Sequence, residues 1–278
     1  MSVVSTNPEI STATQTSRVQ AYDALTKLRI SVMVLFTIAV AAVLSANAAG
    51  VGISFGLMLG ALIGMLMIAS SGNAMNMYLE RYTDFLMPRT ASRPLPAQRL
   101  SSTEVATFAA ITFGVGVAFL FAAVNWQTGV CGIANWILYV FIYTPLKSRT
   151  HWNTEIGAVA GAMPIVMGSL AATASVGLVC WAFFGVLLLW QFPHFMAIAY
   201  MYSEQYESAG YKMITVTDKT GRGANWHALS GAVALILLAP LAVPPIGLLA
   251  TALMVLAVGV AGWQALVVWR FVRDSNTR

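Results

Sequence analysis

The chain has 278 residues, of which 58% are hydrophobic and only 9% are charged, and its net charge at pH 7 is +5. Soluble domains carry about a quarter charged residues, so this composition excludes an ordinary soluble enzyme and indicates a membrane protein. The modest positive charge fits contact with lipid headgroups and does not indicate binding to nucleic acid.

The N-terminal segment is rich in serine and threonine and lacks the basic start and apolar core of a cleaved signal peptide. We therefore expect residues 1–22 to form a disordered cytoplasmic tail and residues 23–278 to form a single transmembrane domain. The two cysteines, Cys131 and Cys180, lie in apolar runs. They are expected to be packing residues and not a disulfide or a metal site.

Four runs contain no Asp, Glu, Lys or Arg, and they cover residues 30–79, 105–146, 156–203 and 223–269. A spanning helix needs roughly 20 apolar residues, so each run is about twice the length of one span. Small, polar or helix-breaking residues stand near the middle of each run, in SANAAG, NWQTG, TASVG and PLAVPPIG. The runs therefore predict four helical hairpins. The expected fold class is all-α, a polytopic membrane bundle of eight spanning helices.

This arrangement places every charged residue on one side of the membrane, which the positive-inside rule identifies as the cytoplasm. Both termini are expected on that side. Three connections there are longer than simple turns, and they cover residues 80–104, 147–155 and 204–222. We expect these connections to meet over a cavity among the helices and to carry the functional residues.

Three polar side chains end the first charge-free run at helical spacing. Asn76, Glu80 and Asp84 stand four residues apart, which places them along one stripe of a helix. Their oxygens suit Mg²⁺, which shares its coordination shell with substrate phosphates. Arg89 and Arg93 follow in the next loop, and guanidinium groups match phosphate oxygens. This order predicts a diphosphate site; the alternative is a helix end whose charges are simply solvated.

The same stretch resembles a known family signature. The pattern N-x-x-x-E-x-x-x-D followed by MPRTASRPLP is similar to the first motif of the UbiA-type intramembrane prenyltransferases. Three further stretches agree in the same order, namely TKLRIS at 26–31, YTPLKSRTHWNTEIGAVAGAMPIVMG at 143–168 and WQFPHFMAIAYMYSEQYESAGYKM at 190–213. Within the family they look most like the protoheme IX farnesyltransferase, or heme O synthase, branch.

The resemblance implies a reaction in the cell inner membrane, with Mg²⁺ as the cofactor. A farnesyl group would move from farnesyl diphosphate to a vinyl group of heme B, and water would add to give heme O. Heme A synthase or a terminal oxidase would be downstream partners, and the lipid bilayer would surround the chain. The resemblance implies catalytic roles for Asn76, Glu80, Asp84, Arg89, Arg93 and Lys147, and substrate binding by Lys27, Arg29, Tyr143, Arg149, Asn153, Trp190, His194 and Tyr206.

The stretch WQFPHF raises a separate question because it places His194 deep within a charge-free run. Ionisable side chains in membrane segments are rare and are usually functional. We expect His194 to contact heme, as an iron ligand or at a propionate. The alternative is a neutral histidine that bonds a carbonyl of a neighbouring helix.

The chain departs from the family pattern in two places. Gln205 stands where the family has an aspartate, and Glu204 and Glu207 beside it are expected to supply the second metal site instead. The family has nine spanning helices, whereas the charge pattern here predicts eight. Two other functions stay open: a UbiA-type prenyltransferase with a quinone-type acceptor, and a non-catalytic heme-binding membrane protein, to which the Gln205 substitution gives weight.

Overall fold

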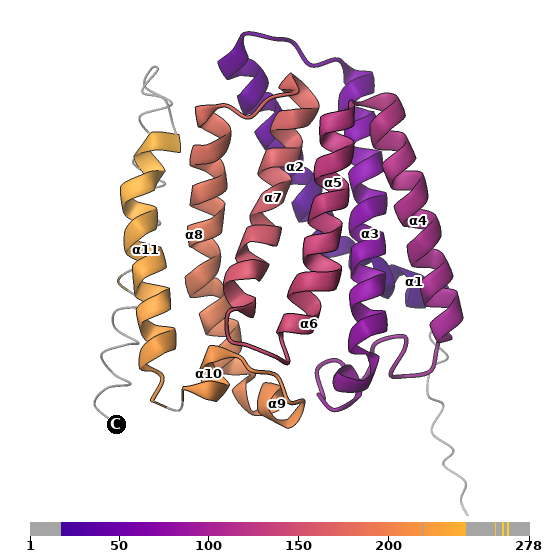
Figure 1. Ribbon diagram of the computed structural model, residues 1–278, viewed down its shortest axis with the longest axis vertical. Coiled ribbons are helices and arrows are strands. Elements are labelled where there is room, and N and C mark those ends of the chain that lie inside the picture. Colours follow the sequence, from indigo (N-terminus) through magenta and orange to yellow (C-terminus); the bar gives the residue numbers. More distant parts are fainter. Residues whose placement is uncertain (1–17, 219, 243–258, 260–262, 264–265, 267–278) are drawn as a thin grey trace, which may run out of the picture.

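A computed structural model describes residues 18–218 and 220–242 of the protein, together with isolated positions further on. Within these residues every regular element is a helix, which confirms the predicted all-α class. The long helices stand side by side in one bundle (Figure 1). Its elements are α1 (Arg18–Thr26), α2 (Leu28–Ala49), α3 (Phe55–Phe85), α4 (Ser102–Ala123), α5 (Trp126–Ile137), a π-helix (Leu138–Tyr143), α6 (Thr144–Leu146), α7 (Asn153–Thr173), α8 (Leu178–Met201), α9 (Ser203–Ser208), α10 (Ile214–Thr217) and α11 (Arg222–Ala242).

Three of the four predicted hairpins are present. The first two pair α2 with α3 and α4 with the α5 segment, and the third pairs α7 with α8. Six helical segments in the described part of the chain are long and apolar enough to cross a membrane, at 18–49, 55–85, 102–123, 126–146, 153–173 and 178–201. The fourth hairpin begins with α11, and most of its predicted break at 240–247 and its second helix lie outside the described residues.

The turns show how local sequence ends each helix. Gly50 ends α2 in the left-handed conformation, at φ 68°, which glycine adopts without steric cost. Asn125 caps α5 by accepting a hydrogen bond from the Thr128 backbone N–H at 2.8 Å. Most of NWQTG therefore belongs to the first turn of α5, and the actual turn is shorter than predicted.

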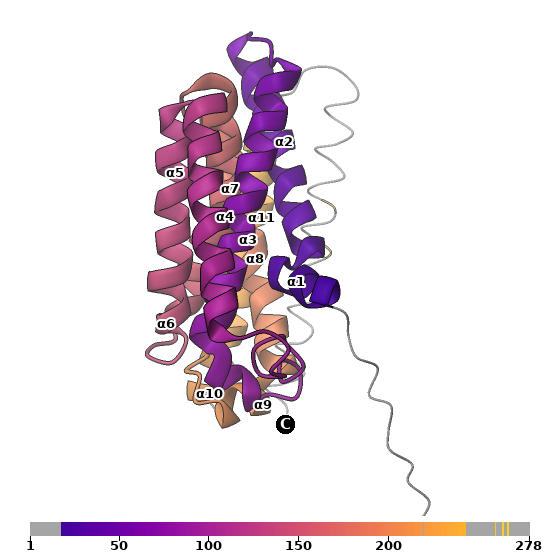
Figure 2. The ribbon, with the colours of Figure 1, turned by 90° about the vertical axis from the view of Figure 1, so that its right-hand side faces the viewer.

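The N-terminal boundary differs from the expectation, because α1 begins at Arg18, inside the segment predicted to be tail. Ala21 and Leu25 of α1 are buried against α3 and the loop that follows it. The burial of these two side chains holds α1 against the bundle, so this segment is not part of a free tail. Lys27 adopts a left-handed conformation at φ 49° and separates α1 from α2, which lets the two helices diverge (Figure 2).

Small residues allow the long helices to pack closely. A Cβ at Gly116 of α4 would stand only 2.9 Å from the Gly64 carbonyl oxygen of α3. Close backbone approach of this kind is a main source of helix association in lipid, where apolar burial alone gives little. Ile38, Met65, Leu120 and Ile165 form the centre of the buried apolar cluster beside this contact.

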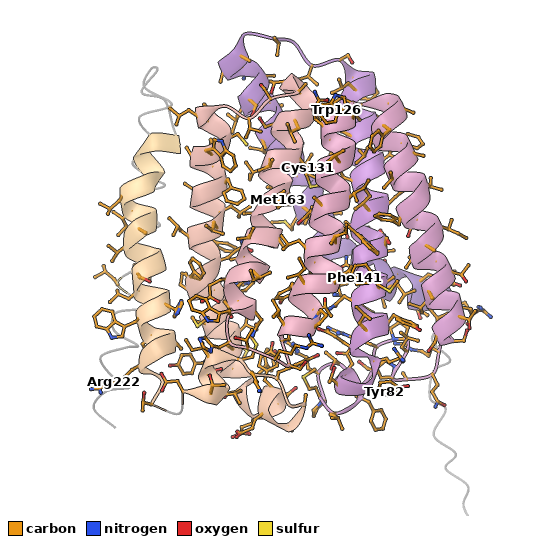
Figure 3. The ribbon with its side chains drawn as sticks, in the orientation of Figure 1. Tyr82, Trp126, Cys131, Phe141, Met163 and Arg222 are labelled. Carbon is orange, nitrogen blue, oxygen red and sulfur yellow. The ribbon has the colours of Figure 1, made fainter. Side chains whose placement is uncertain are left out.

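The connections between the helical pairs gather at one end of the bundle. Helices α1, α6, α9 and α10 and the loop after α3 all lie there (Figures 1 and 2). Tyr82 and Arg222 mark this end, while Trp126 lies at the opposite end (Figure 3). We call it the polar end, and the functional residues predicted from the sequence lie at or near it.

Candidate active site

The predicted stripe on α3 is present and is almost completely buried. Asn76, Glu80 and Asp84 have exposures of 1%, 6% and 0%. Burying two carboxylates on one helix destabilises the folded state unless positive charge stands beside them. This burial rules out a helix end whose charges are merely solvated, the alternative left open by the sequence.

Three cations from separate segments meet this stripe. Lys147, just beyond α6, places its Nζ 2.6 Å from Glu80 Oε1. Arg93 places one guanidinium nitrogen 2.8 and 2.7 Å from the two oxygens of Asp84. The same nitrogen lies 3.8 Å from Glu80. Lys27, at the break between α1 and α2, donates to Asn76 Oδ1 at 3.3 Å.

The loop after α3 folds back because its own hydrogen bonds turn it. Thr90 donates its hydroxyl to the Asp84 carbonyl at 2.9 Å and is buried. The backbone N–H of Arg93 donates to the Thr90 carbonyl at 2.9 Å. Leu95 and Leu100 are buried in the apolar cluster with α1 and anchor the far side of the loop. These contacts carry the Arg93 side chain back over the stripe.

The charged groups line a small cavity, which we call the polar chamber, with a volume of about 110 Å³. A second cavity of about 230 Å³, the apolar cavity, lies among α2, α3, α5, α7 and α8. Tyr139 and Tyr143 line both of them. The walls of the apolar cavity include Ile30, Val34 and Phe195. The polar chamber and the apolar cavity therefore meet at two tyrosine rings.

The π-helix after α5 carries these two tyrosines and determines how their rings are placed. Tyr139 and Tyr143 are stacked, with ring centroids 5.6 Å apart and an angle of 26° between planes. Thr144 donates its hydroxyl to the Tyr139 carbonyl at 2.8 Å, which satisfies a backbone group in the irregular turn. Single turns of π-helix occur frequently at functional sites. The Lys147 ammonium stands 4.7 Å from the centre of the Tyr143 ring.

Lys147 remains charged in this setting. Burial lowers the pKa of Lys147, but the Glu80 carboxylate and the tyrosines around it raise the pKa, and the net pKa lies well above its ordinary value. The ammonium is therefore a permanent positive charge at the boundary between the two cavities.

Arg89 forms a second contact across the polar chamber. Its guanidinium donates to the Tyr206 hydroxyl at 3.2 Å and lies 4.2 Å from the centre of the Tyr202 ring. Gln205 accepts a bond from the Arg89 backbone N–H at 3.4 Å. The neutral Gln205 side chain therefore contacts the loop that carries Arg89.

The family model for the UbiA prenyltransferase family matches residues 34–278 of this sequence. The chain belongs to the UbiA prenyltransferase family. Its long apolar helices agree with the multi-pass membrane character of that family.

Curated relatives of this UbiA member share the family branch that the motifs indicate. The protoheme IX farnesyltransferase of Rhodopirellula baltica is 43% identical over 213 residues, which cover 76% of this chain and 73% of that protein. The protoheme IX farnesyltransferase of Sorangium cellulosum is 39% identical over 187 residues, covering 67% of this chain and 66% of that protein.

The fold agrees with a solved structure of the family. A UbiA homolog from Archaeoglobus fulgidus, bound to DMAPP and Mg²⁺, superimposes with a TM-score of 0.70. The match covers 89% of this chain and 86% of that chain at 16% sequence identity. This similarity establishes the UbiA helical architecture for the present chain.

Several residues predicted for the site are not brought into it. Arg29, Arg149, Glu204 and Glu207 are exposed, and none of them lines the polar chamber or the apolar cavity. Asn153 is buried and donates to the Thr150 carbonyl at 2.7 Å, so it orders the loop before α7. Neither helical periodicity nor a sequence motif shows whether the side chains of these residues point into the site.

The Trp190 and His194 pair in WQFPHF lines neither cavity. Trp190 and His194 are exposed on α8 and stack nearly parallel, with centroids 4.9 Å apart and an angle of 15° between planes. Within the described residues His194 makes no hydrogen bond to a carbonyl of a neighbouring helix, which was the alternative to heme contact. The next residue, Phe195, lines the apolar cavity, so the pair stands beside its wall.

Sequence reasoning missed three residues around the cavities. Tyr139 stands four positions before Tyr143, and that spacing was the available signal. Tyr211 lines the polar chamber and shares a hydrogen bond with Thr83 at 2.8 Å. Burial and the nearby Glu80 charge raise the pKa of Tyr211, so the phenol stays protonated. Gln191 lines the apolar cavity, although WQFPHF had drawn attention only to its neighbours.

The oxygen donors on α3 fit a magnesium ion. Within the described residues no three side chains of His, Cys, Asp or Glu cluster closely enough to hold a metal by themselves. Two carboxylates and an amide oxygen on one stripe leave several coordination positions open, which suits Mg²⁺ because it takes waters and substrate phosphate oxygens. The surrounding cations suit an anionic ligand that would share the ion.

Proposed function

We propose that this chain is a protoheme IX farnesyltransferase. It transfers the farnesyl group of farnesyl diphosphate to a vinyl group of heme B, and water adds to give heme O. The observation that supports this best is the meeting of the polar chamber and the apolar cavity at Tyr139 and Tyr143. One substrate with a charged head and a long apolar tail fits that junction, and the named relatives point to heme as the acceptor.

In this proposal the polar chamber holds the diphosphate. Lys27, Arg89, Arg93 and Lys147 bind its oxygens, because these are the cations that line the chamber. Asn76, Glu80 and Asp84 hold Mg²⁺, which when bound supplies positive charge for the leaving diphosphate. Preorganised charge of this kind stabilises the separation of the allylic carbon from its leaving group.

The farnesyl tail occupies the apolar cavity, and its first carbon lies at the tyrosine pair. The faces of Tyr139 and Tyr143 stabilise the positive charge that develops on the allylic carbon. Helices α2, α3, α5, α7 and α8 keep bulk water away from that carbon. The vinyl group of heme attacks it there and forms the new carbon–carbon bond.

The heme acceptor approaches along α8. The parallel rings of Trp190 and His194 offer a flat, exposed surface next to Phe195, which lines the apolar cavity. A flat macrocycle fits such a surface better than an isolated quinone ring does. An exposed imidazole on a spanning helix also needs a polar partner in lipid, and heme iron or a propionate would supply one.

The His194→Ala variant is expected to weaken heme B binding by about tenfold, the effect of losing one hydrogen bond to a charged group. Binding of farnesyl diphosphate should stay within twofold, because His194 lies outside the polar chamber. Heme titration followed by absorbance measures the affinity for heme B, and isothermal titration calorimetry measures the affinity for farnesyl diphosphate. A changed heme spectrum would assign iron ligation. Unchanged heme affinity would contradict the role of His194.

We also propose that the polar end faces the cytoplasm and that the chain lies in the inner membrane. All four chamber cations belong to this end, and cytoplasmic loops are enriched in Lys and Arg. A cytoplasm-dependent reporter fused ahead of the N-terminus is expected to be active, and activity of a periplasm-dependent reporter at that site would reverse the orientation. The product heme O would pass to heme A synthase or to a terminal oxidase.

The direct test of the function uses purified protein in lipid with Mg²⁺, farnesyl diphosphate and heme B. Extraction and mass analysis should show a heme that has gained one farnesyl group and one water. A prenylated quinone precursor, formed when such an acceptor is offered, would instead assign another UbiA-type activity. Heme binding without any product would indicate a non-catalytic heme-binding protein.

A further inference from the structure

Gln191 is a buried polar side chain in the wall of the apolar cavity that the proposed mechanism does not yet use. It lies on α8 with an exposure of 6%. Its Nε2 donates to the Ala158 carbonyl of α7 at 3.0 Å and to the Leu187 carbonyl at 3.1 Å. Because both partners are carbonyl oxygens, only the amide nitrogen can face them, and the orientation of the side chain is determined.

The amide oxygen of Gln191 is therefore held in a known direction. It lies against Gly161, where a Cβ would overlap it, and Gly161 also lines the apolar cavity. Within the described part of the chain, both hydrogen bonds of the Gln191 side chain start from its nitrogen, and none ends on its oxygen. Most other walls of the cavity are apolar, for example Ile68 and Pro164. A fixed, unoccupied acceptor in such a wall will take a hydrogen bond from a small donor.

We propose that Gln191 Oε1 holds the water molecule that the reaction consumes. This inference rests on the proposed function. When the terminal vinyl carbon of heme B attacks the first farnesyl carbon, a carbon–carbon bond forms and the bond to the diphosphate oxygen breaks. The positive charge then lies on the other vinyl carbon, beside the pyrrole ring. A lone pair of the water forms a carbon–oxygen bond there, and the water loses one proton to the departing diphosphate.

The chemistry suits an amide better than a carboxylate. A neutral oxygen that accepts one proton of the water directs a water lone pair toward the cation without itself carrying a charge into the apolar wall. Asn73 of α3 also lines this cavity, and its Nδ2 donates to the Thr26 carbonyl at 3.0 Å. A polar group in a mainly apolar wall is where a single ordered water is expected.

The test compares Gln191→Met with Gln127→Met in the reconstituted assay with heme B and farnesyl diphosphate. Gln127 lies next to Trp126 at the end of the bundle away from the polar chamber, so it controls for the loss of a glutamine in the bundle. Without the held water, the cation loses a proton from the adjacent carbon and gives a farnesylated heme that is one water lighter than heme O. The ratio of this product to heme O should rise about tenfold in Gln191→Met, as expected for one lost hydrogen bond, and stay unchanged in Gln127→Met.

A rate loss alone would not support the role. If Gln191→Met farnesylates heme more slowly but gives the wild-type product ratio, Gln191 only ties α7 to α8, and the inference is wrong. Gly161→Ala provides a second variant, because it displaces the amide oxygen without removing it, and its product ratio should shift in the same direction. The wild-type reaction distinguishes failure of the proposed function from failure of the role of Gln191. If the wild-type protein yields no heme O, the proposed function is wrong. If it yields heme O, the product ratio of the variants tests only the role of Gln191.

Discussion

Replacing Asp84 with Asn is expected to lower farnesyl transfer by at least ~100-fold, the effect of removing one preorganised charge contact from a water-excluded site. Asp84 is fully buried, and both of its oxygens contact Arg93. The neutral amide keeps the shape but loses the charge that would hold Mg²⁺ and orient the arginine. Glu80→Gln should give a loss of similar size for the same reason.

Single-turnover measurement of heme O formation gives the rate, and thermal unfolding in detergent shows whether the variant folds. Asp23→Asn is the matched control, because Asp23 is exposed on α1 and lies outside the polar chamber. Raising the Mg²⁺ concentration should recover part of the lost rate if Asp84 holds the ion. A folded Asp84→Asn protein with wild-type turnover would remove the α3 stripe from the mechanism.

The Lys147→Met variant is expected to lower kcat/KM by roughly 100-fold, since it removes a charge at the boundary where the leaving group separates. Its ammonium contacts Glu80 at 2.6 Å and stands over the Tyr143 ring. Removing it also leaves the buried Glu80 carboxylate with only Arg93, 3.8 Å away, as a cationic partner, so the loss of stability should stay below the roughly 3–5 kcal/mol of an unpaired buried charge. The Lys147→Arg variant keeps the charge and should recover part of the activity.

Lys212→Met tests whether any nearby lysine matters, because the Lys212 side chain is exposed while its backbone N–H bonds the Lys147 carbonyl at 2.7 Å. Its turnover should match the wild type. Steady-state rates across a farnesyl diphosphate series separate binding from the chemical step. If the folded Lys147→Met protein turns over normally at low and high salt, then Lys147 is only a residue that anchors the membrane surface.

Local sequence patterns were sufficient for the helices and for the stripe. Charge-free runs twice the length of a span indicate hairpins because a backbone in lipid must satisfy its own hydrogen bonds. Asn76, Glu80 and Asp84 lie on one face because helical spacing alone places them there. The first motif could therefore indicate both the chemistry and the family. The end of the tail was predicted too far along the chain, because α1 begins at Arg18 and is held by contacts with α3 and the following loop, which local composition does not reveal.

Tertiary packing decided which charges belong to the site. Lys147 and Arg149 are two positions apart, yet Lys147 is half-buried against Glu80 and Arg149 is exposed. A π-helix before Lys147 changes the helical phase, and no composition rule predicts that irregular turn. The loop after α3 brings Arg93 back onto Asp84 through its own hydrogen bonds.

The same reasoning applies to WQFPHF. By itself the sequence determined that this stretch puts polar side chains at membrane depth, because it lies within a charge-free run. Only the fold decided that Gln191 faces the apolar cavity while His194 lies on the outer surface of α8. Gln191 and His194 are three positions apart, so they lie on only roughly the same face of α8. Which of them faces the cavity depends on where α7 packs against α8. Composition and helical period act along the chain, whereas the site is built from contacts between helices that the chain brings together only when it folds.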